Sequence, residues 1–363
     1  MRSLHLCRAR LAKTDRRRLR ARICGYSRVP AVTQRRALIC GISGQDGAYL
    51  AELLLRKDYA VFGASRDSTS ANLSGLGRLG IRDRVSMVSM APNDFRSVLS
   101  CLVETAPDEV YNLAGQSSVG LSFSQPVETI ESISIGTLNL LETIRFLGRP
   151  VRLYNAGSGE CFGDTGGIAA TEDTPFRPRS PYAVAKACAH NLITNYREAY
   201  HLHCLTGILF NHESPLRPSR FVTQKIVTSA AQIRLGRIDR VRLGNLDVAR
   251  DWGWAPDYVE AMWSMLQLDD PTDFVIATGR TVSLAYFVER AFARVGLDWK
   301  AHVEVDDTLR RPSDIAISSA NPGKAAREFG WVARYDADQV IDAMVDAAMS
   351  SLGGHEAPTS IAG

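Results

Sequence analysis

The amino-acid sequence predicts an α/β fold, a doubly wound parallel sheet followed by a smaller, less regular C-terminal lobe. Two observations lead to this prediction. Short apolar runs alternate with amphipathic stretches through the first half of the chain, as strands alternate with covering helices. From about Pro215 onward, Pro and Gly interrupt the pattern repeatedly, for example in "HESPLRPSRF" and "TLRRPSD". A chain of 363 residues that is 45% hydrophobic can bury the core that such a fold needs.

Each expected element follows from a local pattern. The apolar run 37–40 leads into a glycine-rich turn, and the amphipathic stretch after the turn, through Leu55, is expected to be a helix. A second apolar run at 60–64 completes a strand, helix, strand unit. The alternation continues with strands at 85–90, 109–115 and 151–158 and helices around 95–104 and 135–146. Strands separated by helices in this way pair in parallel, with helices on both faces of the sheet.

The charge of the chain is divided unevenly. Residues 1–36 contain 12 Lys and Arg and one Asp, a net charge of +11, whereas the remainder carries −7. A protein that grips nucleic acid would carry positive charge on its folded surface, so we predict no nucleic-acid partner. We interpret 1–36 as a basic, disordered extension, with a transit peptide or basic arm as the alternative. Residues 346–363 are expected to be a disordered tail.

Membrane and metal sites are not predicted. No apolar run approaches the roughly 20 residues that cross a bilayer. The seven cysteines are scattered singly, and neither they nor His201, His203 and His212 have the spacing of metal ligands. Cysteines in apolar contexts favour a reducing compartment, so we predict a cytoplasmic location.

The turn "GISGQDG" places Gly41, Gly44 and Gly47 between an expected strand and an expected helix. Such glycines allow a tight turn, close approach of the backbone to a pyrophosphate and close helix packing, and a helix N-terminus favours negative charge. The pattern alone is weak, but its context predicts a Rossmann-like dinucleotide site. The predicted cofactor-binding residues are Gly41, Gly44, Gln45, Asp46, Gly47, Arg66, Asp94, Ala114, Gln116, Tyr182 and Lys186.

The residues after the second expected strand bear on which nicotinamide cofactor is bound. An acidic residue there would bind the adenosine ribose, and an arginine would favour the extra phosphate of NADP. Arg66 and Asp67 are adjacent, so the sequence offers both answers. We predict NADP, because the hydroxyls of Ser68, Thr69 and Ser70 follow Arg66 and suit a phosphate. A solvated surface loop is the alternative.

A catalytic pair is predicted in "SPYAVAKACAHNLI". Tyr182 and Lys186 are four residues apart and share one face of a helix, roughly 6 Å apart along its axis. An ammonium near a phenol stabilises the phenolate, so Tyr182 is expected to accept a proton from a sugar hydroxyl. Ser158, at the end of an expected strand, is the candidate donor to the developing carbonyl. An exposed amphipathic helix is the alternative for this motif.

Several longer segments resemble one family. They are "GISGQDGAYLAELLL", "YNLAGQSSVGLSFSQP", "PFRPRSPYAVAKACAHNLITNYREAY", "GILFNHESPLRPSRFVTQKI", "GNLDVARDWGWAPDYVEAMW" and "DFVIATG". Over about 37–330 the chain resembles the extended short-chain dehydrogenase/reductase superfamily and, within it, the GDP-mannose 4,6-dehydratase family. The resemblance implies an NADP-dependent hydro-lyase that converts GDP-mannose to GDP-4-keto-6-deoxymannose and assembles as a homodimer or homotetramer.

The resemblance also implies a role for Glu160. In a 4,6-dehydratase, oxidation at sugar C4 acidifies the C5 hydrogen, a base removes that proton, water leaves from C6, and hydride returns to C6. Glu160 stands two residues after Ser158, where the family carries this base. A helix cap or a surface ion pair is the alternative. The predicted catalytic residues are therefore Ser158, Glu160, Tyr182 and Lys186.

The implied substrate carries a diphosphate, which requires positive charge and amide donors. By similarity to the family motifs, the predicted substrate-binding residues are Ser117, Asn211, Lys225, Arg250, Arg311 and Asp314. We accordingly predict a mainly cofactor-binding Rossmann domain at 37–214, which carries the catalytic residues. A nucleotide-sugar-binding lobe is predicted at 215–345, with some segments returning to the Rossmann domain.

Four positions depart from the family pattern. Gly159 stands where a serine is usual, which predicts that Glu160 acts as both base and acid or that elimination is slower. Trp254 replaces a histidine and bears on substrate packing, and Asp67 replaces an arginine and bears on NADP preference and assembly. Asp314 replaces a glutamate and has a shorter reach.

Two other functions remain open at this point. A reductase or epimerase of a GDP-sugar would use the same fold and Tyr182 but would not need Glu160. A non-catalytic NADP-binding sensor would be expected to lack Tyr182 or Lys186, and both are present.

Overall fold

The computed structural model describes residues 34–353. Residues 1–33 and 354–363 lie outside the described part, and with them most of the predicted basic extension and the end of the predicted tail. The last helix, α12 (Ala337–Gly353), continues through 346–353, where a tail is predicted. It does so because its apolar face continues: Ala348 is buried, and Met349 and Leu352 pack on the same apolar cluster. Within residues 34–353, no helix is long and apolar enough to span a membrane.

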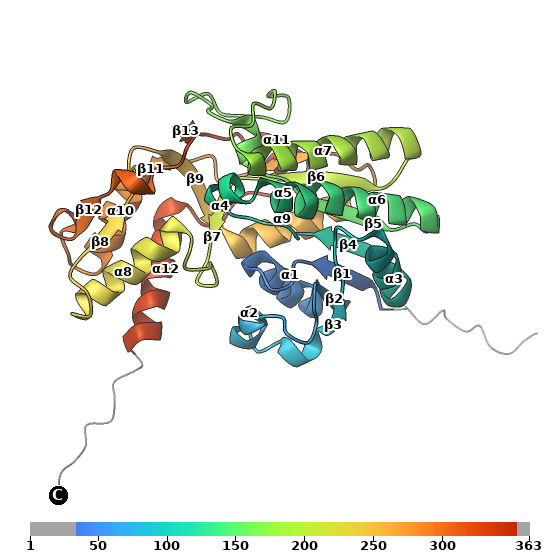
Figure 1. Ribbon diagram of the computed structural model, residues 1–363, viewed down its shortest axis with the longest axis horizontal. Helices are drawn as coiled ribbons and strands as arrows, with labels where there is room; N and C mark the ends of the chain where they lie inside the picture. Colours follow the sequence, from blue (N-terminus) through green and yellow to red (C-terminus); the bar gives the residue numbers. More distant parts are fainter. Residues whose placement is uncertain (1–33, 354–363) are drawn as a thin grey trace, which may run out of the picture. The chain divides into compact units, whose positions relative to one another are not determined.

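Seven parallel strands of the described chain form the central sheet (Figure 1), in the order β10-β6-β5-β4-β1-β2-β3. They are β1 (Arg36–Cys40), β2 (Ala60–Ser65), β3 (Ser86–Ser89), β4 (Glu109–Asn112), β5 (Arg152–Ala156), β6 (Cys204–Leu209) and β10 (Phe274–Ile276). The strand order reverses between β1 and β4, and open sheets of this kind bind ligands at such a switch point. The predicted fold class is therefore confirmed.

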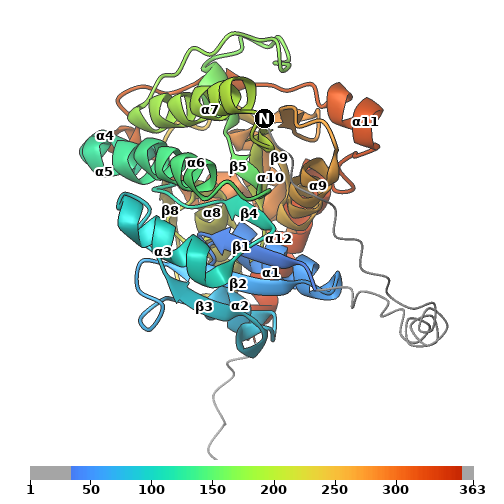
Figure 2. The same ribbon diagram turned by 90° about the vertical axis from the view of Figure 1, so that its right-hand side faces the viewer.

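Helices cover both faces of the sheet, which explains why its strands are apolar along their whole length. In β1, Ala37 and Ile39 pack into one apolar cluster, and Leu38 and Cys40 into another. Figure 2 shows α1 and α9 on one side of the strands and α3, α6 and α7 on the other. Their bounds are α1 (Gln45–Arg56), α9 (Ala255–Gln267), α3 (Phe95–Thr105), α6 (Gly136–Leu147) and α7 (Pro181–Tyr200).

Shorter segments connect these elements. They are α2 (Ser74–Arg78), η1 (Arg82–Arg84), α4 (Val119–Ser124), α5 (Pro126–Ile130), the π-helical turn η2 (Glu131–Ile135) and the 3₁₀ turn η3 (Gly159–Phe162). The turn η3 follows β5 directly, so it lies at the carboxyl edge of the sheet.

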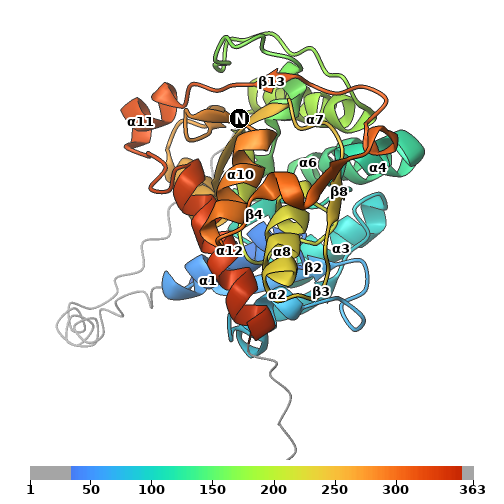
Figure 3. The ribbon, with the colours of Figure 1, turned by 90° about the vertical axis from the view of Figure 1, so that its left-hand side faces the viewer.

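A second group of elements, here called the C-terminal lobe, contains the remaining strands and helices. Its strands are β7 (Asn211–Glu213), β8 (Val241–Leu243), β9 (Ala249–Trp254), β11 (Thr281–Ser283), β12 (Val303–Val305) and β13 (Ile317–Ser318). Its helical segments are α8 (Val222–Arg234), α10 (Leu284–Arg294), η4 (Trp299–Ala301), η5 (Asp307–Leu309) and α12, whereas α11 (Gly323–Phe329) packs on β10 of the central sheet. Figure 3 shows α8, α10 and α12 packed together. Although α9 and β10 follow Pro215 in sequence, they pack with the central sheet.

Candidate active site

A cavity of about 470 Å³ lies between the carboxyl edge of the central sheet and the C-terminal lobe. Its lining combines residues from loops after β4 and β5, from α7, and from β7, α8 and β9. Among the predicted site residues, those that line it are Asp46, Ser117, Ser158, Glu160, Tyr182, Lys186, Asn211, Lys225, Arg250, Arg311 and Asp314. The fold thus brings the predicted catalytic and substrate-binding residues into one cavity.

Ser158 and Glu160 are positioned by the turn that ends β5. Ser158 caps η3, and its hydroxyl accepts a hydrogen bond from the Glu160 backbone N–H at 3.2 Å. The Glu160 side chain is 14% exposed. Burial raises the pKa of Glu160, and the charges of Arg250 and Arg311 oppose this rise. A carboxyl with a raised pKa near a cavity is suited to exchange protons with a ligand.

Tyr182 and Lys186 lie in the first turns of α7, which starts at Pro181 with Ser180 as its cap. The Lys186 ammonium donates to the Ala156 carbonyl at 2.7 Å and lies 5.9 Å from the centre of the Tyr182 ring. Burial lowers the pKa of Lys186 to about 8. Burial also raises the pKa of Tyr182, and its hydrogen bond with Ser158 opposes that rise. Tyr182 and Ser158 therefore lie next to each other in the cavity.

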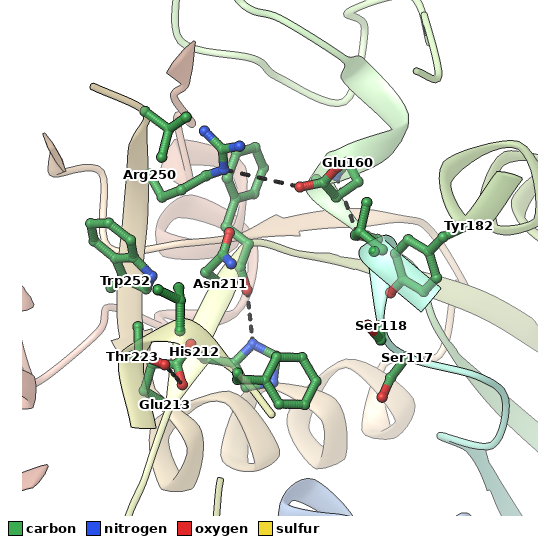
Figure 4. Close-up of a pocket in the computed structure, with 18 of the residues that line it drawn as sticks. Ser117, Ser118, Glu160, Tyr182, Asn211, His212, Glu213, Thr223, Arg250 and Trp252 are labelled. Atoms are coloured by element: carbon green, nitrogen blue, oxygen red, sulfur yellow. Dashed lines mark hydrogen bonds and ion pairs between the residues drawn. The ribbon is translucent and has the colours of Figure 1, made fainter. Parts of the chain in front are cut away.

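Arg250 faces Glu160 across the cavity (Figure 4), and the two side chains point toward each other. Their closest atoms, Arg250 Nε and Glu160 Oε1, are 4.0 Å apart, and Arg250 Nη2 lies 3.5 Å from Asp314 Oδ1. Arg311 approaches the same Asp314 oxygen at 3.9 Å. Because Arg250 is only 5% exposed, these carboxylates interact with it in a weakly screened environment.

The glycine-rich turn has the geometry that a dinucleotide requires. Gly41 has a φ of +91°, and a Cβ there would lie 2.8 Å from the Leu113 carbonyl oxygen. A Cβ on Gly47 would lie 2.5 Å from the Gly41 carbonyl oxygen, so helix and turn pack without space for a side chain. Gly44 differs, since the nearest protein atom to its Cβ would be 3.4 Å away. Gly44 also leaves α1 without a side-chain cap, and an uncapped N-terminus favours an anion.

Gln45 and Asp46, predicted cofactor ligands, connect this turn to β7. The Gln45 amide donates to the His212 carbonyl at 2.9 Å and accepts from the Ser214 hydroxyl at 2.8 Å. His212 Nε2 lies 2.9 Å from Asp46 Oδ2, and the imidazole stacks on Tyr258 with ring centres 4.4 Å apart. Burial opposes ionisation of both groups, but mutual attraction raises the pKa of His212 and lowers that of Asp46.

The other predicted cofactor residues follow strands β2, β3 and β4 at the carboxyl edge of the central sheet. Arg66 directly follows β2, and its side chain is 80% exposed, 3.8 Å from Glu128. Asp94 caps α3 by accepting from the Arg96 N–H at 2.9 Å. Ala114 follows β4 beside Gly41. The Gln116 amide donates to the Ser118 carbonyl at 2.8 Å, so its side chain is bonded within its own loop.

The loop after Arg66 folds around Asp67. Its carboxylate accepts from the Thr69 N–H at 2.8 Å and from the Thr69 and Ser70 hydroxyls at 2.7 Å each. These hydrogen bonds lower the pKa of Asp67 to about 2. Two of the three hydroxyls predicted to suit a phosphate, those of Thr69 and Ser70, therefore donate to Asp67, and the Ser68 hydroxyl is hydrogen-bonded with that of Ser89.

Several residues of the cavity were not predicted. Among them, Arg217 forms an ion pair with Glu213 at 3.1 Å, and Glu213 also accepts from the Thr223 hydroxyl at 2.8 Å. Arg220 donates to the Ser117 hydroxyl at 3.3 Å. The spacing of His212 to other histidines is unsuitable for a metal site, and the sequence predicts no other role for it. Its partner Asp46 is 166 residues away, and no sequence spacing reveals such a pair.

The departures from the family pattern have local explanations. A Cβ on Gly159 would lie 3.0 Å from ring atoms of Phe210, which itself stacks on Phe162. Trp254 does not line the cavity but stacks on Tyr335 with ring centres 5.3 Å apart. The expectation that Trp254 affects substrate packing is therefore not supported by direct contact.

The fold and the cavity together define a class of protein. A parallel sheet with a glycine-rich first turn, whose carboxyl edge brings together a Ser, a Tyr and a Lys, is the arrangement of the short-chain dehydrogenase/reductase class. Solved structures of similar fold include dTDP-glucose 4,6-dehydratase from Bacillus anthracis in complex with NAD (TM-score 0.76, 20% identity, 88% of this chain and 98% of that one). RMD from Pseudomonas aeruginosa complexed with NADPH is another (TM-score 0.71, 21% identity, covering 88% of this chain and 98% of that one).

Sequence comparisons identify the family within this class. The model of GDP-mannose 4,6 dehydratase matches residues 38–344. GDP-mannose 4,6 dehydratase 1 of Arabidopsis thaliana is 43% identical over 320 residues, covering 85% of this chain and 88% of that one. The human GDP-mannose 4,6 dehydratase is 41% identical over 336 residues, covering 86% and 90%. The chain belongs to the GDP-mannose 4,6-dehydratase family, which confirms the resemblance and the predicted enzyme class, a hydro-lyase.

Proposed function

We propose that this protein converts GDP-mannose to GDP-4-keto-6-deoxymannose and water, using Ser158, Glu160, Tyr182 and Lys186. The observation that carries the proposal is that Glu160 shares a cavity with the Tyr182 and Lys186 pair. A reductase or an epimerase needs a group that donates or accepts a proton at the carbonyl oxygen, but no carboxylate for elimination. The buried position of Glu160, opposite Arg250, argues against a surface ion pair as its role.

The glycine turn fits a nicotinamide dinucleotide, because Gly44 carries no side chain at the uncapped start of α1 and the backbone there can approach a pyrophosphate closely. When bound, this cofactor supplies hydride chemistry, accepting hydride from sugar C4 and returning it to C6. We propose NADP, with Arg66 binding the phosphate on the adenosine ribose. The exposed guanidinium of Arg66 and the engagement of Asp67 by Thr69 and Ser70 support this choice over NAD.

Tyr182 accepts the proton of the C4 hydroxyl while Ser158 donates a hydrogen bond to the same oxygen. The Lys186 ammonium stabilises the phenolate through its positive charge. The Ala156 carbonyl, which accepts from Lys186, fixes the position of that charge. Proton acceptance by Tyr182 therefore depends on Lys186 remaining protonated.

Glu160 removes the proton from C5 once C4 is a ketone. The C5 electron pair forms the C5–C6 double bond, and the C6 hydroxyl leaves as water with a proton from Glu160. Glu160, now a carboxylate, takes up a proton from solvent and passes it to C5 when hydride reaches C6, and Tyr182 releases the proton of the C4 hydroxyl to solvent. Since the Phe210 ring occupies the space beside Gly159, Glu160 serves as both base and acid in this chain.

Basic residues of the C-terminal lobe bind the nucleotide diphosphate. Lys225, Arg250 and Arg311 all line the cavity, as does Asn211 of β7. Of the described residues that line the cavity, seven are Lys or Arg and four are Asp or Glu. This excess of positive charge suits a ligand with two phosphates. We propose that 37–214 mainly binds the cofactor and carries the catalytic residues, and that 215–345 mainly binds the nucleotide sugar, with α9 and β10 returning to the central sheet.

The proposal is tested by incubating the purified protein with GDP-mannose and NADP and following the products by mass spectrometry. The expected product is lighter than GDP-mannose by one water, with no net accumulation of NADPH. Accumulation of NADPH in proportion to product would indicate a dehydrogenase instead. An unchanged substrate mass with altered chromatographic mobility would indicate an epimerase.

A further inference from the structure

Two arginines of the loop between β7 and α8 contact one aromatic ring at the edge of the cavity. The guanidinium carbon of Arg217 lies 3.6 Å from the centre of the Phe221 ring, and that of Arg220 lies 5.0 Å from it. All three residues line the cavity. The ring therefore holds two positive charges close together at one side of the cavity.

The two charges differ in how they are neutralised. Arg217 forms its ion pair with Glu213, whose side chain is 2% exposed. The ion pairs among residues 34–353 do not include Arg220, whose hydrogen bond is made to the neutral Ser117 hydroxyl. Burial and the like charge of Arg217 lower the pKa of Arg220. A negative group of a ligand placed beside Arg220 would offset this repulsion. Arg217 already has a negative partner, the Glu213 carboxylate.

The contact of Arg220 with Ser117 indicates where in the cavity a negative group of a ligand would lie. Ser117 belongs to the loop that follows β4, at the switch point of the central sheet, whereas Arg220 belongs to the C-terminal lobe. Arg220 thus connects the C-terminal lobe to the switch point of the central sheet within the lining of the cavity. A guanidinium in such a place can donate two parallel hydrogen bonds to phosphate oxygens.

We propose that Arg220 is a further ligand-binding residue of this site, one that donates to a diphosphate oxygen. This inference rests on the proposed function and extends it to a residue of the loop after β7. Both a sugar nucleotide and a dinucleotide cofactor contain a diphosphate, so the chemistry of recognition is shared and the experiment separates the two sources.

The test compares Arg220→Gln with Arg78→Gln by isothermal titration calorimetry, using GDP in one arm and NADP in the other. Arg78 is the matched control, because it donates to the Pro215 carbonyl of the same loop at 2.9 Å but does not line the cavity. We expect Arg220→Gln to weaken binding of one ligand roughly tenfold, the loss of one charge-assisted contact. Arg78→Gln is expected to change neither affinity more than about twofold.

The arm in which affinity falls identifies the diphosphate that Arg220 binds. Arg220→Lys, which keeps the charge but not the fork geometry, should fall between wild type and Arg220→Gln. Equal affinity of wild type and Arg220→Gln for both ligands would overturn the proposal, as would an equal loss in Arg78→Gln, which would indicate a loosened loop. If the wild-type protein binds NADP but no GDP, the proposed function fails, and Arg220 is judged on the NADP arm alone.

Discussion

Arg250 Nε lies 4.0 Å from Glu160 Oε1, and the same guanidinium lies 3.5 Å from Asp314. Arg250 comes from β9 and Glu160 from the turn after β5, so the pair connects the C-terminal lobe to the catalytic edge of the sheet. A guanidinium at this distance favours the ionised form of Glu160, whereas burial favours the neutral form. The balance of these two effects sets the pH range in which Glu160 can act as a base.

Replacing Arg250 by glutamine is expected to raise the pKa of Glu160 further, because burial would then act with less opposition. The acid limb of the pH profile of kcat/KM should move to higher pH by roughly one unit. Arg311→Gln is the matched comparison, since its charge acts on Glu160 less strongly than that of Arg250. A lower kcat/KM with an unmoved acid limb would mean that Arg250 binds substrate without tuning Glu160.

Glu160→Gln keeps the shape of the side chain but removes the base. Formation of the water-loss product should fall about 10²- to 10⁴-fold, the usual contribution of a general base. Binding of NADP should stay within about twofold of wild type, because Glu160 makes no contact with the glycine turn. Product formation at the wild-type rate would show that another group removes the C5 proton.

Lys186→Met is expected to stabilise the protein while it abolishes activity. Burial lowers the pKa of Lys186 to about 8, so the folded state bears the cost of a buried charge below that pH. The cost fades as pH rises from about 8 toward the unfolded value of about 10.4. It is at most about 3 kcal/mol, and loss of the hydrogen bond to Ala156 reduces the net gain to about 1–2 kcal/mol.

Urea denaturation of wild type and Lys186→Met at about pH 7 and pH 9.5 checks this expectation. The free energy of unfolding of the variant should exceed that of wild type at the lower pH, and the difference should shrink at the higher pH. If the variant is less stable than wild type at both pH values, the contacts of the Lys186 side chain stabilise the folded state by more than burial of its charge costs.

His212→Gln should destabilise the protein more in acid than in base. The Asp46 carboxylate raises the pKa of His212 in spite of burial, so the stabilising pair is fully formed below the unfolded pKa of about 6.5. The stabilisation is lost as pH rises through the raised folded value. We expect the loss in free energy of unfolding to be about 1–2 kcal/mol larger at about pH 6 than at pH 9. Equal losses at the two pH values would show that stacking on Tyr258 is the main contribution of His212.

Two glycines of the turn should respond differently to alanine. Gly47→Ala places a methyl group 2.5 Å from a backbone oxygen and should lower the melting temperature markedly. Gly44→Ala has room within the protein, so its melting temperature should change little while its affinity for NADP falls. Thermal scanning and NADP titration of the two variants measure both effects. If Gly44→Ala binds NADP with the wild-type affinity, the pyrophosphate does not lie against Gly44.

The parts of the fold that have a local pattern could be predicted from the sequence. The apolar run of β1 and the glycines after it are specified within a dozen residues, and the expected strands agree with β3, β4 and β5 to within about three residues at each end. Tyr182 and Lys186 could be paired because a helix places residues four apart on one face. The helical extent of α12 was missed, since its last turns depend on contacts with α8 and α10.

The rest of the site depends on pairs that are distant in sequence. Asp46 meets His212, and Ser117 meets Arg220, only when the C-terminal lobe folds against the sheet. A single sequence contains no spacing that encodes such contacts. For the same reason, the partners of Arg250 became known only from the structure, although the residue itself was predicted to bind substrate.

In the proposed reaction, hydride removed from C4 returns to C6 of the same sugar while Glu160 eliminates water. GDP-mannose deuterated at C4 tests this most directly, with the product analysed by mass spectrometry and NMR. We expect a product that has lost one water and carries the deuterium at C6, with no net formation of reduced cofactor. Deuterium retained at C4, or released into free reduced cofactor, would contradict it.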